Sequence, residues 1–382
     1  MPKKKREKKV SEEEAKLLEE LKRLMREGRR AYGGKNLKEA KKLFSKGQEL
    51  THEKGWKEDA AVFKGSILIA DKKYNEAINL LTPLLEKETL HLKGHAYDRI
   101  GLALSKLGLY DKAIAYYRKA LKEPSYDTPG YAWNNMGLAY KNKGDYDKAI
   151  ECFQKALDTP SYDTPGDAWN NMGLAYNNKG DYDKAIEFHR KALNTTNYDT
   201  PGNAWNNMGL AYKNKGDYDK ALEYYRKALD TPDYGTPGYT WYNMGLAYMY
   251  KGEFDEALEW LKKARVWYEE NEPEGVEGTD VFIRGVQLRM RLQKSGLTDA
   301  DEEAQKIAKL RGDLKPDDPL NRILDVYEKN TNIVSDYADK PGSDHRDVLA
   351  ILKGWSSSIP IVSSVERHDG RNPAYLHNRL LY

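Results

Sequence analysis

The stretch that decides the fold is residues 129–157, which read PGYAWNNMGLAYKNKGDYDKAIECFQKAL. In its first half, Trp133, Met136, Gly137 and Tyr140 stand at positions i, i+3, i+4 and i+7, which is the spacing of one face of an α-helix. Most of the polar residues between them fall on the other faces. We therefore expect an amphipathic helix over the first half of the stretch.

The second half of the stretch predicts a second helix. Ala149, Phe153 and Ala156 are four and three residues apart, and they form its apolar face. Gly137, which has no Cβ, and the small Ala149 allow the two helices to approach each other closely. The stretch is therefore predicted to fold as a helical hairpin.

Start and stop signals surround both helices. Thr128 is expected to cap the first helix, and Pro129 follows in the first turn, where the missing N–H of proline leaves no partner unsatisfied. Gly144 is placed to end the first helix in a left-handed conformation. Asp145 follows as the expected N-cap of the second helix.

The hairpin pattern recurs with a period of 36 residues. Its strongest copies carry a tryptophan at the same place, namely Trp133, Trp169, Trp205 and Trp241. Residues 129–164 and 165–200 differ at only eight of 36 aligned positions, which indicates duplication. Weaker copies extend backward through Gly101 and Gly65, and a capping box at Ser11 opens the earliest helix.

This ladder of repeats predicts four parts of the chain. Residues 1–10 form a basic disordered tail, and residues 11–270 form an array of about seven helical hairpins. Residues 271–314 form capping helices, because the last unit of an array must present a polar outer side. Residues 315–382 form a helical and extended tail.

The pattern Trp-x2-Met-Gly-x2-Tyr, followed by Ala-x3-Phe and Pro160, resembles the tetratricopeptide repeat, whose usual period is about 34 residues. The two extra residues fall in the loop over residues 159–166. The resemblance implies an all-α fold, a right-handed superhelical solenoid of helical hairpins with an atypical C-terminal extension. It also implies a non-enzymatic scaffold that binds a peptide or partner protein in its concave groove.

The resemblance also indicates which side chains line that groove, because the first helix of each hairpin faces it. The fifth, ninth and thirteenth positions of three successive units supply amides and leucines: Asn134, Asn170, Asn206, Leu138, Leu174, Leu210, Asn142, Asn178 and Asn214. The corresponding region of the next unit is largely aromatic: Tyr239, Tyr242, Leu246, Met249 and Tyr250.

Two interpretations of each set remain open. An asparagine side chain offers one acceptor and two donors, so a row of amides is suited to gripping the backbone of an extended peptide. Asparagine at the fifth position is equally suited to hydrogen bonds between neighbouring helices. The aromatic set provides a hot spot for a partner, or it packs against the capping helices.

Composition and motifs disfavour several other classes of protein. The 63 Lys and Arg residues nearly balance the 60 Asp and Glu residues, so a nucleic-acid surface over the whole protein is not expected. The sequence has neither an apolar run of membrane-helix length nor a secretory signal, so we expect a cytoplasmic protein without a membrane partner. Cys152 is the single cysteine, and no metal, phosphate-loop or nucleophile motif occurs, so no metal site, cofactor or catalytic residue is predicted.

Two alternative functions depend on the ends of the chain. The basic segment from Pro2 to Lys9 resembles a nuclear localisation signal or a nucleic-acid arm, although such runs are more often solvated tails. The segment from Ile351 to Pro360 resembles the lead-in to a metallo-β-lactamase-type domain of some bacterial repeat proteins, without that domain's histidine cluster. It suggests a regulatory subunit whose C-terminal tail docks onto or inhibits a separately encoded effector enzyme.

Overall fold

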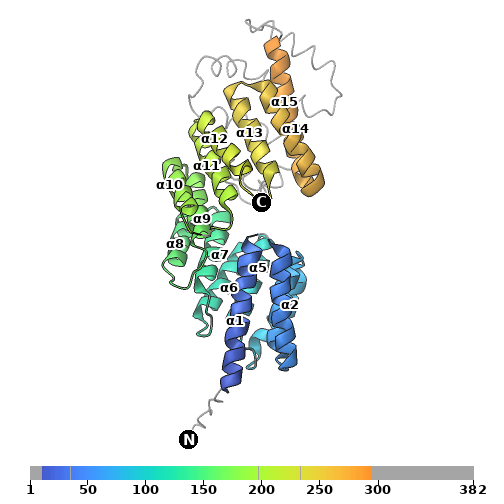
Figure 1. Cartoon of the computed structure of the whole chain (residues 1–382), viewed down its shortest axis with the longest axis vertical. Coiled ribbons are helices and arrows are strands. Elements are labelled where there is room, and N and C mark those ends of the chain that lie inside the picture. Colours follow the sequence, from blue (N-terminus) through green and yellow to red (C-terminus); the bar gives the residue numbers. More distant parts are fainter. Residues whose placement is uncertain (1–10, 35, 197, 233, 295–382) are drawn as a thin grey trace. The chain divides into compact units, whose positions relative to one another are not determined.

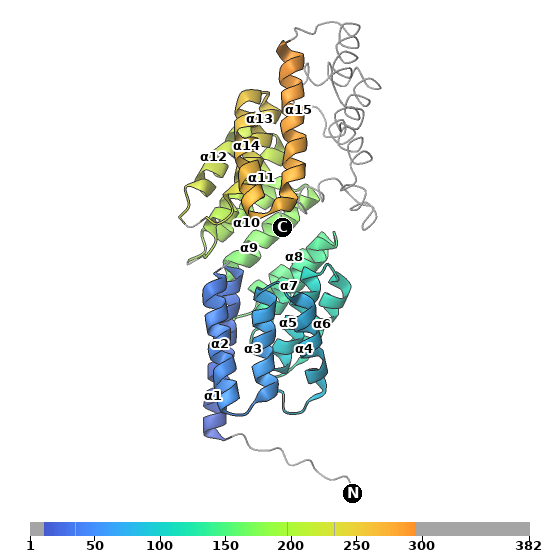
Figure 2. The ribbon, with the colours of Figure 1, turned by 90° about the vertical axis from the view of Figure 1, so that its right-hand side faces the viewer.

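A computed structural model of the protein describes residues 11–294, except residues 35, 197 and 233. The chain divides into two compact units, Met1–Pro201 and Gly202–Tyr382. The described residues of both units form helices joined by short loops, and none of them forms a strand (Figures 1 and 2). This confirms the predicted all-α class.

The first unit contains five helical hairpins, in which each helix packs against the next one along the chain. Its elements are α1 (Glu12–Gly33), α2 (Leu37–Glu53), α3 (Lys57–Ala70), α4 (Tyr74–Leu81), the 3-10 turn η1 (Thr82–Glu86), α5 (Lys93–Lys106), α6 (Tyr110–Lys122), α7 (Pro129–Asn142), α8 (Tyr146–Leu157), α9 (Pro165–Lys179) and α10 (Tyr182–Leu193).

The second unit continues the same order of elements with α11 (Pro201–Lys215), α12 (Tyr218–Leu229), α13 (Pro237–Lys251), α14 (Phe254–Asn271), the 3-10 turn η2 (Pro273–Gly275) and α15 (Val276–Lys294). Helix α15 packs against α14 in the segment predicted to cap the array. The basic tail predicted for residues 1–10, the remainder of the capping segment and the tail predicted for residues 315–382 lie outside the described residues.

The ends of the helices follow the predicted signals. Gly144, after α7, has a φ of 84°, which is the left-handed conformation expected there. The side chain of Asp145 accepts a hydrogen bond from the backbone N–H of Lys148 at 3.3 Å and so caps α8. Ser11 and Glu14 form the capping box that opens α1.

The prediction that threonine caps the first helix of each hairpin was correct for its position but wrong for the hydrogen bond of its side chain. Thr128 occupies the N-cap position of α7, but its side chain makes no capping hydrogen bond. Its hydroxyl oxygen instead accepts a hydrogen bond from Nη1 of Arg29, at 2.6 Å. The side chains of Thr164 and Thr236 also make no capping bond. Pro129 and its equivalents still begin these helices as expected.

Close packing within a hairpin depends on the predicted small residues. A Cβ added to Gly137 would lie 2.5 Å from Cε1 of Phe153, so only glycine permits this approach without a shift. In the following hairpin a Cβ on Gly173 would lie 2.6 Å from Cε1 of His189. Ala149, on the facing helix, is completely buried.

Successive hairpins are joined by a tyrosine of the loop between them. The ring of Tyr162 covers Gly130 so closely that an added Cβ would lie 2.6 Å from Cβ of the tyrosine. The ring of Tyr198 covers Gly166 in the same way, with 2.4 Å between an added Cβ and Cδ2. In the second unit Tyr234 covers Gly202. Each such loop therefore fixes the start of the preceding hairpin against the start of the next.

Candidate binding surface

The fifth-position asparagines of the first unit are mostly buried, and their carbonyl oxygens are engaged inside the protein. Asn134 is 8% exposed, and its Oδ1 accepts a hydrogen bond from Nδ2 of Asn171 at 3.1 Å. Asn170 is 9% exposed, and its Oδ1 lies 2.9 Å from Nδ1 of His189. These bonds join neighbouring helices, as the second interpretation of the asparagine row requires.

The fifth position of the second unit behaves similarly. Oδ1 of Asn206 accepts hydrogen bonds from the hydroxyl of Thr240 at 3.1 Å and from Nδ2 of Asn243 at 3.4 Å. The acceptor of Asn206 is thus directed toward α13. A peptide bound at Asn206 would therefore contact its amide nitrogen and not its amide oxygen.

The ninth-position leucines differ in their exposure. Leu174 and Leu210 are each 3% exposed, and Leu246 is 1% exposed, so they belong to the core. Leu138 is only half-buried. Sequence reasoning placed all of them on the groove because position alone does not show how closely adjacent first helices pack.

The thirteenth position provides a row that reaches the surface. Asn142 and Asn178 in the first unit are half-buried, as are Asn214 and Tyr250 in the second. The residue at the twelfth position of these units is buried instead. There, burial lowers the pKa of Lys141 to about 8 and the pKa of Lys213 to about 7.

The aromatic set of the second unit packs mainly against the helices that follow it. The ring of Tyr242 meets the ring of Phe282, on α15, edge-on with 5.6 Å between centroids. The hydroxyl of Tyr239 donates a hydrogen bond to Glu272, and its ring lies 5.7 Å from the ring of Tyr268. Met249 is also buried, whereas Tyr250 is half-buried.

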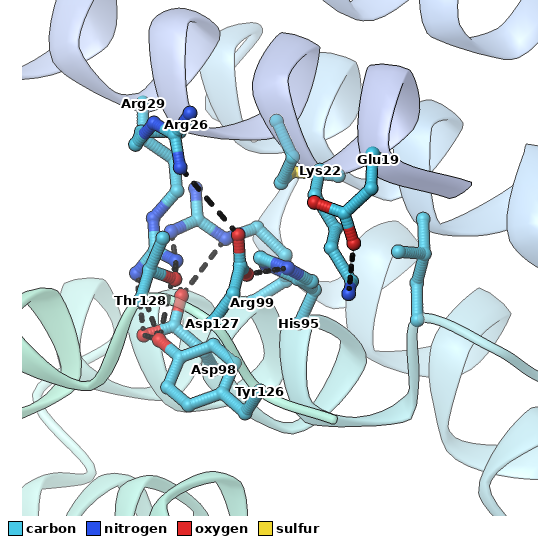
Figure 3. A network of polar contacts seen from close by, with 12 residues as sticks. Glu19, Lys22, Arg26, Arg29, His95, Asp98, Arg99, Tyr126, Asp127 and Thr128 are labelled. Atoms are coloured by element: carbon cyan, nitrogen blue, oxygen red, sulfur yellow. Dashed lines mark hydrogen bonds and ion pairs between the residues drawn. The ribbon is translucent and has the colours of Figure 1, made fainter. Parts of the chain in front are cut away.

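A buried ionic cluster in the first unit was missed by sequence reasoning (Figure 3). The guanidinium of Arg29, on α1, lies 2.9 Å from the carboxylate of Asp98, on α5. Arg99 donates two hydrogen bonds to the same carboxylate, at 3.0 and 2.6 Å. Burial raises the pKa of Asp98, but the two arginines outweigh it and leave that pKa below its usual value.

The guanidinium of Arg29 is held by further groups of the loop before α7. It donates to the hydroxyl oxygen of Tyr126 at 3.1 Å and to that of Thr128 at 2.6 Å. Its Cζ atom also lies 4.6 Å from the centre of the Tyr131 ring, a cation–π contact. We call Asp98, Tyr126, Thr128 and Tyr131 the arginine cradle.

Two further contacts join α1 to the loops of later hairpins. Asp127 lies 3.7 Å from Arg26 and 2.8 Å from Nε2 of the buried His95. Arg30 donates two hydrogen bonds to the carboxylate of Asp199, at 2.9 and 3.1 Å. The sequence signal was the spacing of these arginines on α1 together with the aspartate that follows each loop tyrosine of the first unit.

Neither a metal site nor a membrane-spanning helix was found in the part of the chain that the structure describes. No group of three or more metal-ligating side chains occurs between residues 11 and 294, outside the gaps. In the same residues no helix is both long and apolar enough to cross a membrane. Burial raises the pKa of the Cys152 thiol to about 11, so the thiol is protonated at neutral pH.

Comparison with known proteins gives one consistent result. Three family models described as tetratricopeptide repeats match the chain, one over residues 94–124, one over residues 130–159 and 238–265, and one over residues 165–231. The search of curated proteins found no matching sequence.

Several solved structures are also similar to this chain. A chain of the APC/C hetero-tetramer Cut9–Hcn1 is 20% identical over 70% of this chain, with a TM-score of 0.53. This chain covers only 48% of that one, about half its length. A repeat protein from Parabacteroides merdae is 16% identical over 70% of this chain and 99% of its own, with a TM-score of 0.48. MamA is 29% identical over 46% of this chain and 96% of its own, with a TM-score of 0.35.

Proposed function

Because the chain is a tetratricopeptide repeat protein, we propose that it is a non-enzymatic scaffold that binds a peptide or partner protein on the first helices of its hairpins. Arrays of this kind present extended surfaces rather than a reactive pocket. The two alternatives drawn from the chain ends fall on residues outside the structure, and no observation favours them.

The observation that supports the proposal is the partly exposed thirteenth-position row. Asn142 and Asn178 repeat at the same place on α7 and α9, and both side chains are half-buried. The ninth-position residue four places earlier is half-buried at Leu138 and buried at Leu174. Amide side chains can bond a peptide backbone as donor and as acceptor. We therefore assign the contact with the partner to this row and to Leu138, in place of the buried fifth position.

Site-specific photo-crosslinking tests this assignment. A benzophenone amino acid is placed at Asn178 or, as the control, at Glu187, an exposed residue of α10. We expect a discrete crosslinked partner from Asn178 and none from Glu187. The partner is then identified by mass spectrometry and purified for a direct affinity measurement.

The affinity measurement separates the row from the rest of the surface. The double variant Asn142→Ala and Asn178→Ala is expected to weaken binding of the purified partner by about tenfold or more, because two interfacial amides are lost. Glu187→Ala should leave the affinity unchanged. Crosslinks that arise from Glu187 but not from Asn178 would place the interface on the opposite side of the hairpins and refute the proposal.

A further inference from the structure

The arginine cradle belongs to a repeating pattern. Two of its four members, Tyr126 and Thr128, occur again 36 residues later, because the units are copies of one another. Tyr126 and Thr128 recur as Tyr162 and Thr164, in the loop between α8 and α9. The same loop chemistry that holds a guanidinium before α7 is therefore present before α9.

The second copy has no guanidinium bonded to its hydroxyls. Tyr162 is 8% exposed, and within the described part of the chain neither its hydroxyl nor that of Thr164 makes a hydrogen bond of ordinary geometry. The Thr164 hydroxyl does lie close enough to the Asp167 carboxylate to act against the rise in its pKa. In the first copy the equivalent hydroxyls both accept hydrogen bonds from Arg29. A buried hydroxyl without a partner costs free energy, so the second copy is an incomplete site.

The charge of the second copy also matches a cation. Asp98 of the cradle is replaced by Asn134, but Tyr131 is replaced by Asp167, so the copy again contains one carboxylate. Asp163 and Asp199 are exposed nearby, and the carboxylate of Asp163 accepts a hydrogen bond from the hydroxyl of Tyr131 at 2.7 Å. Three carboxylates thus gather near Arg30, which directs its two hydrogen bonds to Asp199.

We propose that Tyr162, Thr164 and Asp167 form a second arginine site, which binds an arginine side chain of the partner. This assignment rests on the proposed function, because it names the chemistry of one residue of the bound peptide. The occupied cradle shows the mode of binding: hydroxyl oxygens accept from the guanidinium while a carboxylate balances its charge.

The experiment uses the full chain and a short peptide probe. The probe is acetyl-Gly-Gly-Arg-Gly-Gly-amide, and the matched control peptide carries citrulline, which keeps the shape of arginine but lacks its charge. Binding is measured by ligand-observed NMR titration. We expect the arginine peptide to bind at least about tenfold more tightly than the citrulline peptide, because a charge-assisted bond is lost in the control.

Variants locate the binding. Asp167→Asn should weaken the arginine peptide by about tenfold, and Tyr162→Phe by several-fold, because each removes one acceptor of the site. Asp147→Asn is the matched control, since it removes the same charge from an exposed residue that pairs with Lys179 on the surface. Circular dichroism is recorded for every variant so that loss of fold is not mistaken for loss of binding.

Three outcomes would overturn the second arginine site. They are equal binding of the two peptides, equal loss of binding in Asp147→Asn and Asp167→Asn, and tighter binding after deletion of residues 1–10, which would assign the site to the chain's own basic segment. If the probe fails while the thirteenth-row variants still weaken the partner, only this inference falls. If the probe binds as expected and those variants leave the partner unaffected, the proposed groove falls instead.

Discussion

His189 occupies a position at which the neighbouring hairpins carry phenylalanine or tyrosine. It is completely buried, and Phe153 and Tyr225 stand at the same place in the hairpins before and after it. Burial lowers its pKa to about 3, so the folded protein keeps this ring neutral at every pH near neutrality. The unfolded chain takes up a proton near pH 6.5, so the stability contributed by the neutral ring is lost as the pH falls below that value.

The first prediction concerns this histidine. Lowering the pH from 7 to 5 should cost the native protein about 2 kcal/mol through His189 alone. His189→Phe removes the titration and reproduces a combination that the chain already has at Phe153 and Asn134. Urea denaturation of both proteins at pH 7 and pH 5 tests this, with the variant expected to lose about 2 kcal/mol less between the two. Parallel losses would show that His189 is protonated when folded.

Asp167 has the opposite pH dependence. Burial, followed by the carboxylate of Asp199, raises its pKa to about 6, above the ordinary value of 3.8. The folded state therefore holds this proton more tightly than the unfolded state, and the carboxyl becomes a destabilising group as the pH rises from about 4 to 6.

Asp167→Asn should consequently stabilise the protein, in contrast to its expected effect on arginine binding. We expect a gain of about 1–2 kcal/mol at pH 7 that disappears as the pH approaches 4. Thermal unfolding of both proteins across this pH range measures the difference. A variant that is less stable at pH 7 would mean that the carboxylate is well compensated in the native state.

Gly137 tests the packing inside one hairpin. An added Cβ would overlap Phe153, so Gly137→Ala should destabilise the protein by about 1–3 kcal/mol. Gly33, at the end of α1, is the matched control because a Cβ there meets nothing within 4 Å. Gly33→Ala should be neutral or slightly stabilising. The midpoints of urea denaturation compare the two, and equal midpoints would contradict the packing argument.

At the scale of the helix, we expect the aspartate caps to contribute more stability than the threonine caps, because only the aspartate side chains make a capping hydrogen bond. Asp181 caps α10 by accepting a hydrogen bond from the backbone of Lys184, so Asp181→Ala should cost about 1 kcal/mol. Thr164 stands at the cap position of α9 without such a bond, so Thr164→Val should cost less than about 0.5 kcal/mol. Thermal unfolding measures both. A larger loss at Thr164 would show that its hydroxyl is engaged after all.

The elements themselves were predictable because their signals are local. The helix face through Trp133 and Tyr140, the left-handed Gly144 and the cap at Asp145 all lie within one 36-residue unit. The hydroxyl of Thr128 was mispredicted because its partner, Arg29, is 99 residues away. Local sequence therefore determined where helices begin and end, but it did not determine which partners the side chains choose.

At the scale of the whole chain, α1 departs from the rule that each repeat contacts only its neighbours. Arg29 and Arg30 bind residues of the loops that precede α7 and α11, up to 169 residues away. Such contacts depend on how the hairpins of the first unit stack. The ionic cluster and the burial of Leu174 were both unpredictable for this reason.

Deletion of residues 1–35 tests this departure. In a simple array the loss would affect α2 and α3, but here the amides near Thr128 and Asp199 should also lose protection from hydrogen exchange. Deletion of residues 1–10 is the control and should leave those amides unchanged. Exchange measured by mass spectrometry distinguishes the cases, and unchanged protection in the longer deletion would limit α1 to the role of an ordinary end cap.

The contact between each loop tyrosine and the glycine of the preceding hairpin makes the boundaries between units interchangeable. Tyr162 on Gly130 and Tyr198 on Gly166 are the same joint, built from residues 32 positions apart. A genetic duplication or loss of one whole 36-residue unit would therefore recreate a working joint at once, whereas any other length would break one. A change in copy number by whole units therefore leaves this type of joint intact.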